Sequence, residues 1–174
     1  MTTSTGVYFR REDYASFWRR LIVDFIDAAT VGLVCTIAII GLWAFVPGNL
    51  ILIVCVMIFF CHFVLLKRSK GGTLGYRMGG VRIVGLDGQR PGILALTIRM
   101  LFMVLGPINY LLDVVWLTSD EQRQALRDKF ADTYVVRRGA EPVGSAKVVH
   151  RYYYILGYNF LFREVEARKA ASVN

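Results

Sequence analysis

The sequence predicts an all-α membrane protein with two transmembrane helices and a kinked or re-entrant helical hairpin. It also predicts a small cytoplasmic two-stranded β element and an aromatic C-terminal tail. Two observations support this fold class. The chain is 55% hydrophobic, which exceeds the share usual for a soluble domain. No Asp, Glu, Lys or Arg occurs from Ala28 to Leu66, whereas a soluble helix of that length normally shows a polar face.

The uncharged run is interrupted once, by the triplet Pro47-Gly48-Asn49. This leaves 19 residues from Ala28 to Val46 and 17 from Leu50 to Leu66. A helix needs roughly 17–25 apolar residues to cross a bilayer. The two segments are therefore expected to be transmembrane helices joined by a very short turn.

The net charge of +8 is explained by membrane topology, so nucleic acid is not an expected partner. Seven basic residues and one acid occur between Lys67 and Arg99, four arginines precede the first span, and the 47–49 turn is uncharged. Cytoplasmic loops carry an excess of Lys and Arg. The N-terminus and the 67–99 segment are therefore expected to face the cytoplasm. With a lone His62 and with cysteines only inside the spans, neither a metal site nor a cofactor is expected.

The third apolar segment, Ile93 to Leu117, is interrupted at Gly106-Pro107, where a helix should break. Each half is too short to span, which leaves either one kinked span or a re-entrant hairpin. A full crossing would place five basic residues of 119–138 outside the cell. It would also separate the strand-like segments 81–84 and 133–136, which are expected to pair. The re-entrant hairpin, packed on the first two helices, is therefore preferred.

The other segments are polar or mixed in character. Residues 1–13 are expected to be mobile, and 119–132 to form an amphipathic helix. Residues 14–138 are expected to form the membrane domain, and 139–174 a linker and an aromatic tail. That tail is expected to be an interfacial helix or, alternatively, an arm that docks on another membrane protein. Its partner-binding candidates are Tyr152, Tyr153, Tyr154, Tyr158, Phe160 and Phe162.

Three charged residues, Arg20, Asp24 and Asp27, share one face of the first helix because they are spaced by three or four positions. Asp27 lies about 10 Å deeper along the helix than Arg20. An ionisable residue at that depth suggests a functional site, although an internal ion pair that fixes helix packing is an equal alternative. The candidate partners from elsewhere in the chain are Arg99 and the pair Asp128-Lys129.

Three motifs in order resemble the RDD family of bacterial membrane proteins. The first is Phe-Trp-Arg-Arg-Leu-Ile-Val-Asp-Phe-Ile-Asp at 17–27, and the second is the glycine-rich segment 72–84. The third is Arg-Asp-Lys-Phe-Ala-Asp-Thr-Tyr-Val-Val at 127–136. The resemblance assigns the family's arginine to Arg20 and its aspartates to Asp27 and Asp128. Two departures are Asp24, where the family is usually apolar, and Leu126, where it commonly has glycine.

The resemblance implies a protein of the bacterial inner membrane, and some family members are associated with sodium/proton exchange. We expect a small non-enzymatic accessory or assembly subunit that docks on other integral membrane subunits or on itself. In that case Arg20, Asp27 and Asp128 would tie the first helix to the closing cytoplasmic helix. The alternative is an ion/proton transporter in which Asp27 cycles a proton and Arg20 tunes its pKa. No catalytic constellation or cofactor motif suggests an enzyme.

Overall fold

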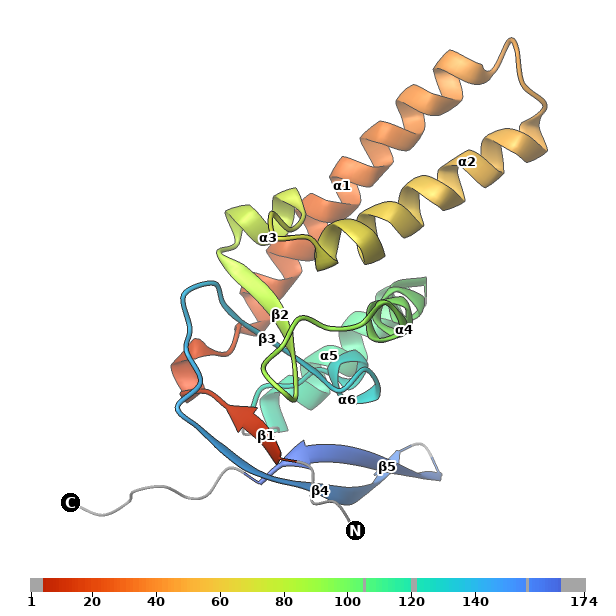
Figure 1. Cartoon of the computed structure of the whole chain (residues 1–174). Helices are drawn as coiled ribbons and strands as arrows, with labels where there is room; N and C mark the ends of the chain where they lie inside the picture. Colours follow the sequence, from red (N-terminus) through yellow and green to blue (C-terminus); the bar gives the residue numbers. More distant parts are fainter. Residues whose placement is uncertain (1–4, 105, 120–121, 156, 167–174) are drawn as a thin grey trace.

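Two long apolar helices extend from a body of short helices and strands (Figure 1). The computed structural model describes residues 5–104, 106–119, 122–155 and 157–166. Helix α1 covers Phe17–Leu42, and α2 covers Gly48–Phe60 and continues as the π-helix η2, Cys61–Leu66. Both are long and apolar enough to cross a membrane. The prediction of two candidate spans joined by a short turn is confirmed.

The prediction that the fold is all-α is wrong, because the described residues include five strands in two antiparallel sheets. One sheet pairs β2 (Val81–Gly85) with β3 (Thr133–Arg137), and Val84 lies opposite Tyr134. This is the pairing predicted from the sequence. It brings together two segments that flank the third apolar segment.

The second sheet has the order β1-β4-β5, from Thr5–Tyr8, Gly144–Ile155 and Tyr158–Val165. Two predictions are therefore wrong. Residues 5–8 of the N-terminal segment are a paired strand, and the tail is a β-hairpin and not an interfacial helix. Valine and aromatic side chains favour the pleated, half-buried surface of a strand. The hairpin alternates accordingly, since Tyr152 and Tyr154 are exposed whereas Tyr153 is half-buried.

The third apolar segment forms α4 (Ile93–Val104) and α5 (Pro107–Ser119), and the chain breaks at Gly106 with a positive φ of 59°. The predicted break is confirmed, and neither helix is long enough to span a bilayer. Helix α4 packs against η2. It is seen nearly end-on in Figure 1, where α1 and α2 run across the view, so it crosses them steeply. Its re-entrant placement in the bilayer stays a prediction.

The predicted helix at 119–132 is wrong over most of its length. The structure has only the short α6 (Leu126–Phe130), while Ser119 still belongs to α5 and residues 120–121 lie outside the described part. A positive φ of 46° at Arg123 interrupts helical geometry between the two helices. The remaining short elements are η1 (Arg11–Asp13) and α3 (Leu74–Met78).

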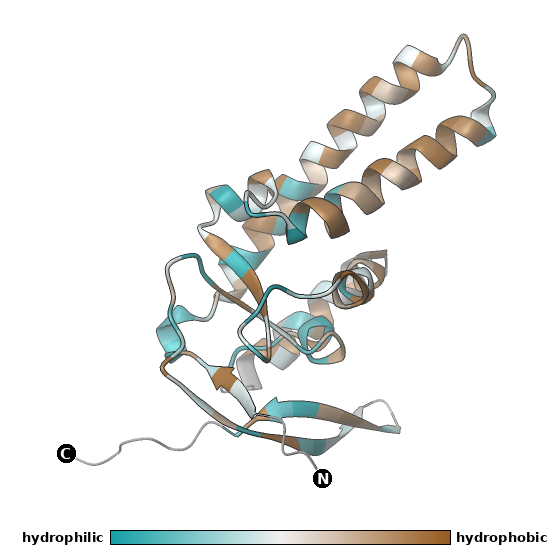
Figure 2. Ribbon diagram, viewed as in Figure 1, coloured by the Kyte–Doolittle hydropathy of each residue, from teal (hydrophilic) through white to brown (hydrophobic). Residues whose placement is uncertain are grey.

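Two apolar clusters hold the body together. One lies where α1, η2, α3, β2 and α4 meet and includes the buried Val23, Val64 and Leu96. The other joins the two sheets through Phe9 and Tyr134, whose rings contact edge to face. The apolar lengths of α1 and α2 lie beyond both clusters, and hydrophilic residues gather where these helices reach α3 (Figure 2).

Candidate functional site

A buried group of charged side chains lies where the two spans enter the body; we name it the inner charge cluster. Four cations and four carboxylates make it up, so it has no net charge when all are ionised. Each member's side chain is buried. They come from α1, the end of η2, α4, α5 and α6. The members are Arg20, Asp24, Asp27, Lys67, Arg99, Asp113, Arg127 and Asp128.

Asp128 binds two of the arginines. Arg20 and Arg99 each donate to one of its carboxylate oxygens, and the backbone N–H of Ala125 donates to Oδ2 at 3.1 Å. Burial alone would raise the pKa of Asp128, but the charges of Arg20, Arg99 and Arg127 outweigh it and hold that pKa well below its usual value. Asp128 is therefore an ionised carboxylate that connects α1, α4 and α6.

Arg127, the residue before Asp128, contacts two other carboxylates. Its Nη2 donates to Asp24 Oδ2 at 2.6 Å, and its Nε lies 3.2 Å from Asp113 Oδ2. Burial raises the pKa of Asp113 to about 6, against the attraction of Arg127 and with repulsion from Asp128 adding to the rise. Asp113 lies on α5, outside the two spans, and its Oδ1 has no hydrogen-bond partner among the described residues.

Asp27 is 0% exposed and accepts from the first turn of α3. The Thr73 hydroxyl donates to Oδ2 at 2.8 Å, and the Gly75 N–H donates to Oδ1 at 2.9 Å. Lys67 Nζ and His62 Nε2 each lie 3.5 Å from its carboxylate. A methyl group at Gly75 would come within 2.6 Å of Asp27 Oδ1. The glycine is therefore required for α3 to approach α1 this closely.

The structure separates the partners of Arg20 and Asp27. Both lie on the buried face of α1, as their spacing predicts, but Arg20 reaches α6 whereas Asp27 reaches α3. The predicted partners Arg99 and Asp128 lie together with Arg20. Lys129, which was also predicted, pairs with Glu164. Asp24 lies between the two groups and contacts Arg127 and Lys67 Nζ, the latter at 3.8 Å.

Several members of the cluster were not recognised in the sequence: Lys67, Asp113 and Arg127. A signal for Lys67 exists, because Asp27 lies 20 residues before Pro47 and Lys67 lies 18 after Asn49. In an antiparallel hairpin two such positions lie at similar depth. Asp113 also carries a signal, because it is the one acidic residue of the third apolar segment, Ile93 to Leu117. Its partner was not predictable, since the contact with Arg127 depends on how α5 folds back onto α6.

The aromatic tail contacts the body through one of its two faces. Phe162 and Phe160 pack on Phe130 of α6, with ring centroids 4.9 and 5.6 Å away. Lys129 of α6 binds Glu164 Oε1 at 2.5 Å, and the Tyr153 hydroxyl donates to the same oxygen at 2.6 Å. Three of the predicted partner-binding residues therefore belong to an internal interface.

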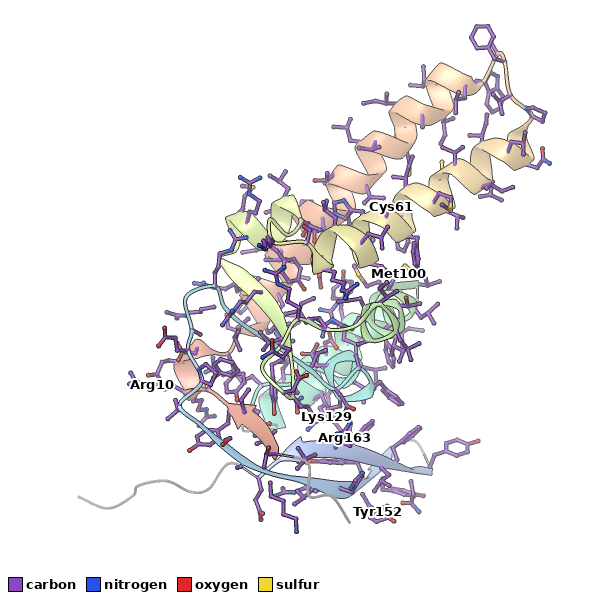
Figure 3. The ribbon with its side chains drawn as sticks, viewed as in Figure 1. Arg10, Cys61, Met100, Lys129, Tyr152 and Arg163 are labelled. Carbon is purple, nitrogen blue, oxygen red and sulfur yellow. The ribbon has the colours of Figure 1, made fainter. Side chains whose placement is uncertain are left out.

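The other three predicted residues are exposed. Tyr152 and Tyr154 lie on the opposite face of the hairpin, whereas Tyr158 lies opposite Ile155 beside the turn, in register with Phe160. Tyr152, Tyr154 and Tyr158 are 77%, 75% and 71% exposed. Figure 3 shows Tyr152 on the outer side of the hairpin, with Lys129 on the side toward the body. We name these three exposed side chains, two on the outer face and one beside the turn, the outer tyrosine face.

The cluster shows no metal-binding arrangement: among the described residues, no three His, Cys, Asp or Glu side chains gather as ligands. Its chemistry is that of ion pairs and hydrogen bonds in a dry environment. Such a cluster can fix the relative positions of helices, or it can pass a proton between neighbouring groups.

Comparison with known proteins gives one positive result. The model of the RDD family matches residues 14–132, which extends from the strand bridge at Tyr14 to the end of α6 and includes the whole inner charge cluster. No curated protein and no solved structure matches the chain.

Proposed function

The chain belongs to the RDD family and is a membrane protein, and from this premise we propose that it is a non-enzymatic accessory or assembly subunit. It would lie in the bacterial inner membrane, with its N-terminus and the 67–99 segment in the cytoplasm. Its partner would be the cytoplasmic surface of another integral membrane subunit. The outer tyrosine face is the observation that carries this proposal.

Tyr152, Tyr154 and Tyr158 give this one hairpin three exposed aromatic side chains. Aromatic side chains are enriched in the buried centres of protein interfaces. The hairpin lies at the end of the molecule opposite the free ends of α1 and α2 (Figure 1). Lipid that surrounds the two spans would therefore not reach Tyr152, Tyr154 and Tyr158, and a protein is the fitting occupant.

The inner charge cluster supports a structural role within this proposal. Its four carboxylates each contact a Lys or Arg of the same cluster, so charge is balanced internally. Three consecutive residues of α6 contact other elements: Arg127 contacts α5, Asp128 contacts α4 and Lys129 contacts β5. Arg127 and Asp128 also contact α1. One short helix thereby connects the membrane anchor to the hairpin that carries the outer tyrosine face.

The test replaces Tyr152, Tyr154 and Tyr158 with serine and measures particle mass after extraction in a mild detergent. The parent protein is expected to elute in a discrete complex larger than its own mass, and the triple variant at its own mass. Val143→Ser is a matched control, because Val143 is 53% exposed and lies outside the hairpin. If the parent protein elutes alone, or if the triple variant stays in the complex, the proposal is wrong.

A second candidate, the ion/proton transporter, is supported by the connection between the cluster's acidic groups. Asp113, Arg127, Asp24, Lys67 and Asp27 form an unbroken series of contacts, none longer than 3.8 Å. Lys67 takes the position beside Asp27 that the sequence had suggested for Arg20. Under this alternative, Asp27→Asn abolishes cation-driven proton movement in vesicles while the exposed Glu141→Gln does not. Unchanged transport in Asp27→Asn would exclude it.

A further inference from the structure

We propose that the basic cavity beside the end of the second span binds a phosphate-bearing anion, such as the headgroup of an anionic phospholipid. The cavity has a volume of about 220 Å³ and lies between the turn that follows η2, the first turn of α3, and β2 with its following loop. It is separate from the outer tyrosine face and does not depend on the role of an accessory subunit, but it rests on the proposed cytoplasmic placement of the 67–99 segment.

The lining of this cavity is strongly basic. Six of its residues are Lys or Arg, and none is Asp or Glu. The six are Lys67, Arg68, Lys70, Arg82, Arg90 and Arg138. Guanidinium and ammonium groups are the side chains that recognise phosphate oxygens. A ligand for this cavity is therefore anionic.

Most of these charges are not neutralised by the protein. Lys67 at the inner end is paired with Asp24 and Asp27, and its Nζ also lies 4.6 Å from the Tyr76 ring centroid. For the other five cations, no ion pair with a carboxylate occurs in the part of the chain that the structure describes. Five uncompensated cations around one cavity repel one another, and a bound anion would relieve that repulsion.

The rim of the cavity is held in place before any ligand binds. Ser69 Oγ donates to the Leu66 carbonyl at 2.7 Å and accepts from the Gly72 N–H at 3.1 Å. Arg138 Nη2 donates to the Gly71 carbonyl at 2.8 Å, which ties this turn to the end of β3. The turn that carries Arg68 and Lys70 is therefore ordered, so less conformational freedom is lost on binding.

The position of the cavity fits the headgroup layer of the membrane. Arg68 and Lys70 lie two and four residues after Leu66, the last residue of the second apolar span. Basic residues next to the cytoplasmic end of a span lie at the level of anionic lipid phosphates. The volume of about 220 Å³ is below the roughly 300–1,000 Å³ of sites for drug-sized ligands. It suits a headgroup-sized anion.

The test titrates the full chain in a neutral detergent and counts bound ligand by native mass spectrometry. The probes are dioleoylphosphatidylglycerol, dioleoylphosphatidylcholine and sn-glycerol 3-phosphate. The cavity variant carries Arg68→Gln, Lys70→Gln and Arg90→Gln. The control variant carries Arg10→Gln, Arg11→Gln and Lys147→Gln, three exposed cations that do not line the cavity. All six substitutions are at exposed positions, so both variants should keep the parent's unfolding temperature without ligand.

We expect saturable binding of one phosphatidylglycerol, weakened roughly tenfold or more in the cavity variant and much less in the control. The same pattern with glycerol phosphate would also support the site and identify a soluble ligand as its occupant. The inference is overturned if neither of the two anionic probes binds, if phosphatidylcholine binds as tightly as phosphatidylglycerol, or if both variants lose binding equally.

Discussion

Arg20 of α1 and Asp128 of α6 are 108 positions apart and form a buried ion pair. Arg99 of α4 binds the other oxygen of the same carboxylate. Two arginines of different helices thus depend on one acidic side chain. The family's arginine and second aspartate, which the motifs assign to Arg20 and Asp128, meet directly, while the first aspartate, Asp27, binds α3.

Replacing Asp128 with asparagine should destabilise the protein strongly. The substitution leaves Arg20 and Arg99 buried without their shared counter-charge, and loss of one partner from a buried pair costs roughly 3–5 kcal/mol. We expect a large fall in the thermal unfolding temperature in detergent. Glu141→Gln, at an exposed position, should leave that temperature unchanged. If the two variants unfold alike, Asp128 does not hold the helices together.

The stability of the protein should depend on pH through Asp113. Its pKa is raised to about 6 in the folded protein, so between about pH 4 and pH 6 the folded state binds more protons than the unfolded state. The contribution of this group to the free energy of unfolding therefore falls as pH rises above about 4, and it is lost as pH passes the folded pKa near 6. Between pH 5 and pH 7 the fall amounts to roughly 1–2 kcal/mol. Asp128 acts in the opposite direction, since its lowered pKa makes stability fall only as pH drops below its ordinary value near 4.

Asp113→Asn isolates this effect. The variant should lose most of the fall in unfolding temperature between pH 5 and pH 7.5, because an amide does not ionise. Glu141→Gln should keep the parent's pH profile. A profile in Asp113→Asn that is as steep as the parent's would show that another group titrates in this window.

The parts of the fold that could be predicted depend on local signals. The spans follow from apolar length, and the break follows from the pair Gly106-Pro107. The β2–β3 pairing follows from two short strand-like segments, of which 81–84 alternates. The hairpin was missed because Tyr152, Tyr153 and Tyr154 are all aromatic, so the alternation of exposed and inward side chains is not visible in residue type. The strand Thr5–Tyr8 was missed because its partner lies near the other end of the chain.

The sequence predicted some members of the candidate site but not all of their contacts. Helix spacing placed Arg20, Asp24 and Asp27 on one face, and the motif match pointed to Asp128. The contacts of Asp27 with Thr73 and Gly75 depend on how the glycine-rich segment folds against α1. Charged side chains alone did not indicate this, because two of the donors are a hydroxyl and a backbone N–H.

Gly75→Ala should separate α3 from α1. The added methyl group would meet the Val23 carbonyl and the Asp27 carboxylate, and overpacking of this kind costs typically about 1–3 kcal/mol. Gly71→Ala is the matched control, because its nearest neighbour would be Ser69 Oγ at 3.9 Å. Thermal unfolding should show the difference. Equal stability of the two variants would mean that α3 does not need its close approach to Asp27.

Phe162→Ala should detach the hairpin from α6 without unfolding the membrane part. The Phe162 ring packs on Phe130 and is 4% exposed, and truncation of a buried phenylalanine costs roughly 3–5 kcal/mol. Because this contact lies on the hairpin's inner face, hydrogen exchange should rise in β4 and β5 and remain low in α1 and α2. Tyr158→Ala removes an exposed ring from the same hairpin and should leave exchange unchanged. If exchange in Phe162→Ala rises equally in the spans, the hairpin and the membrane anchor unfold as one unit.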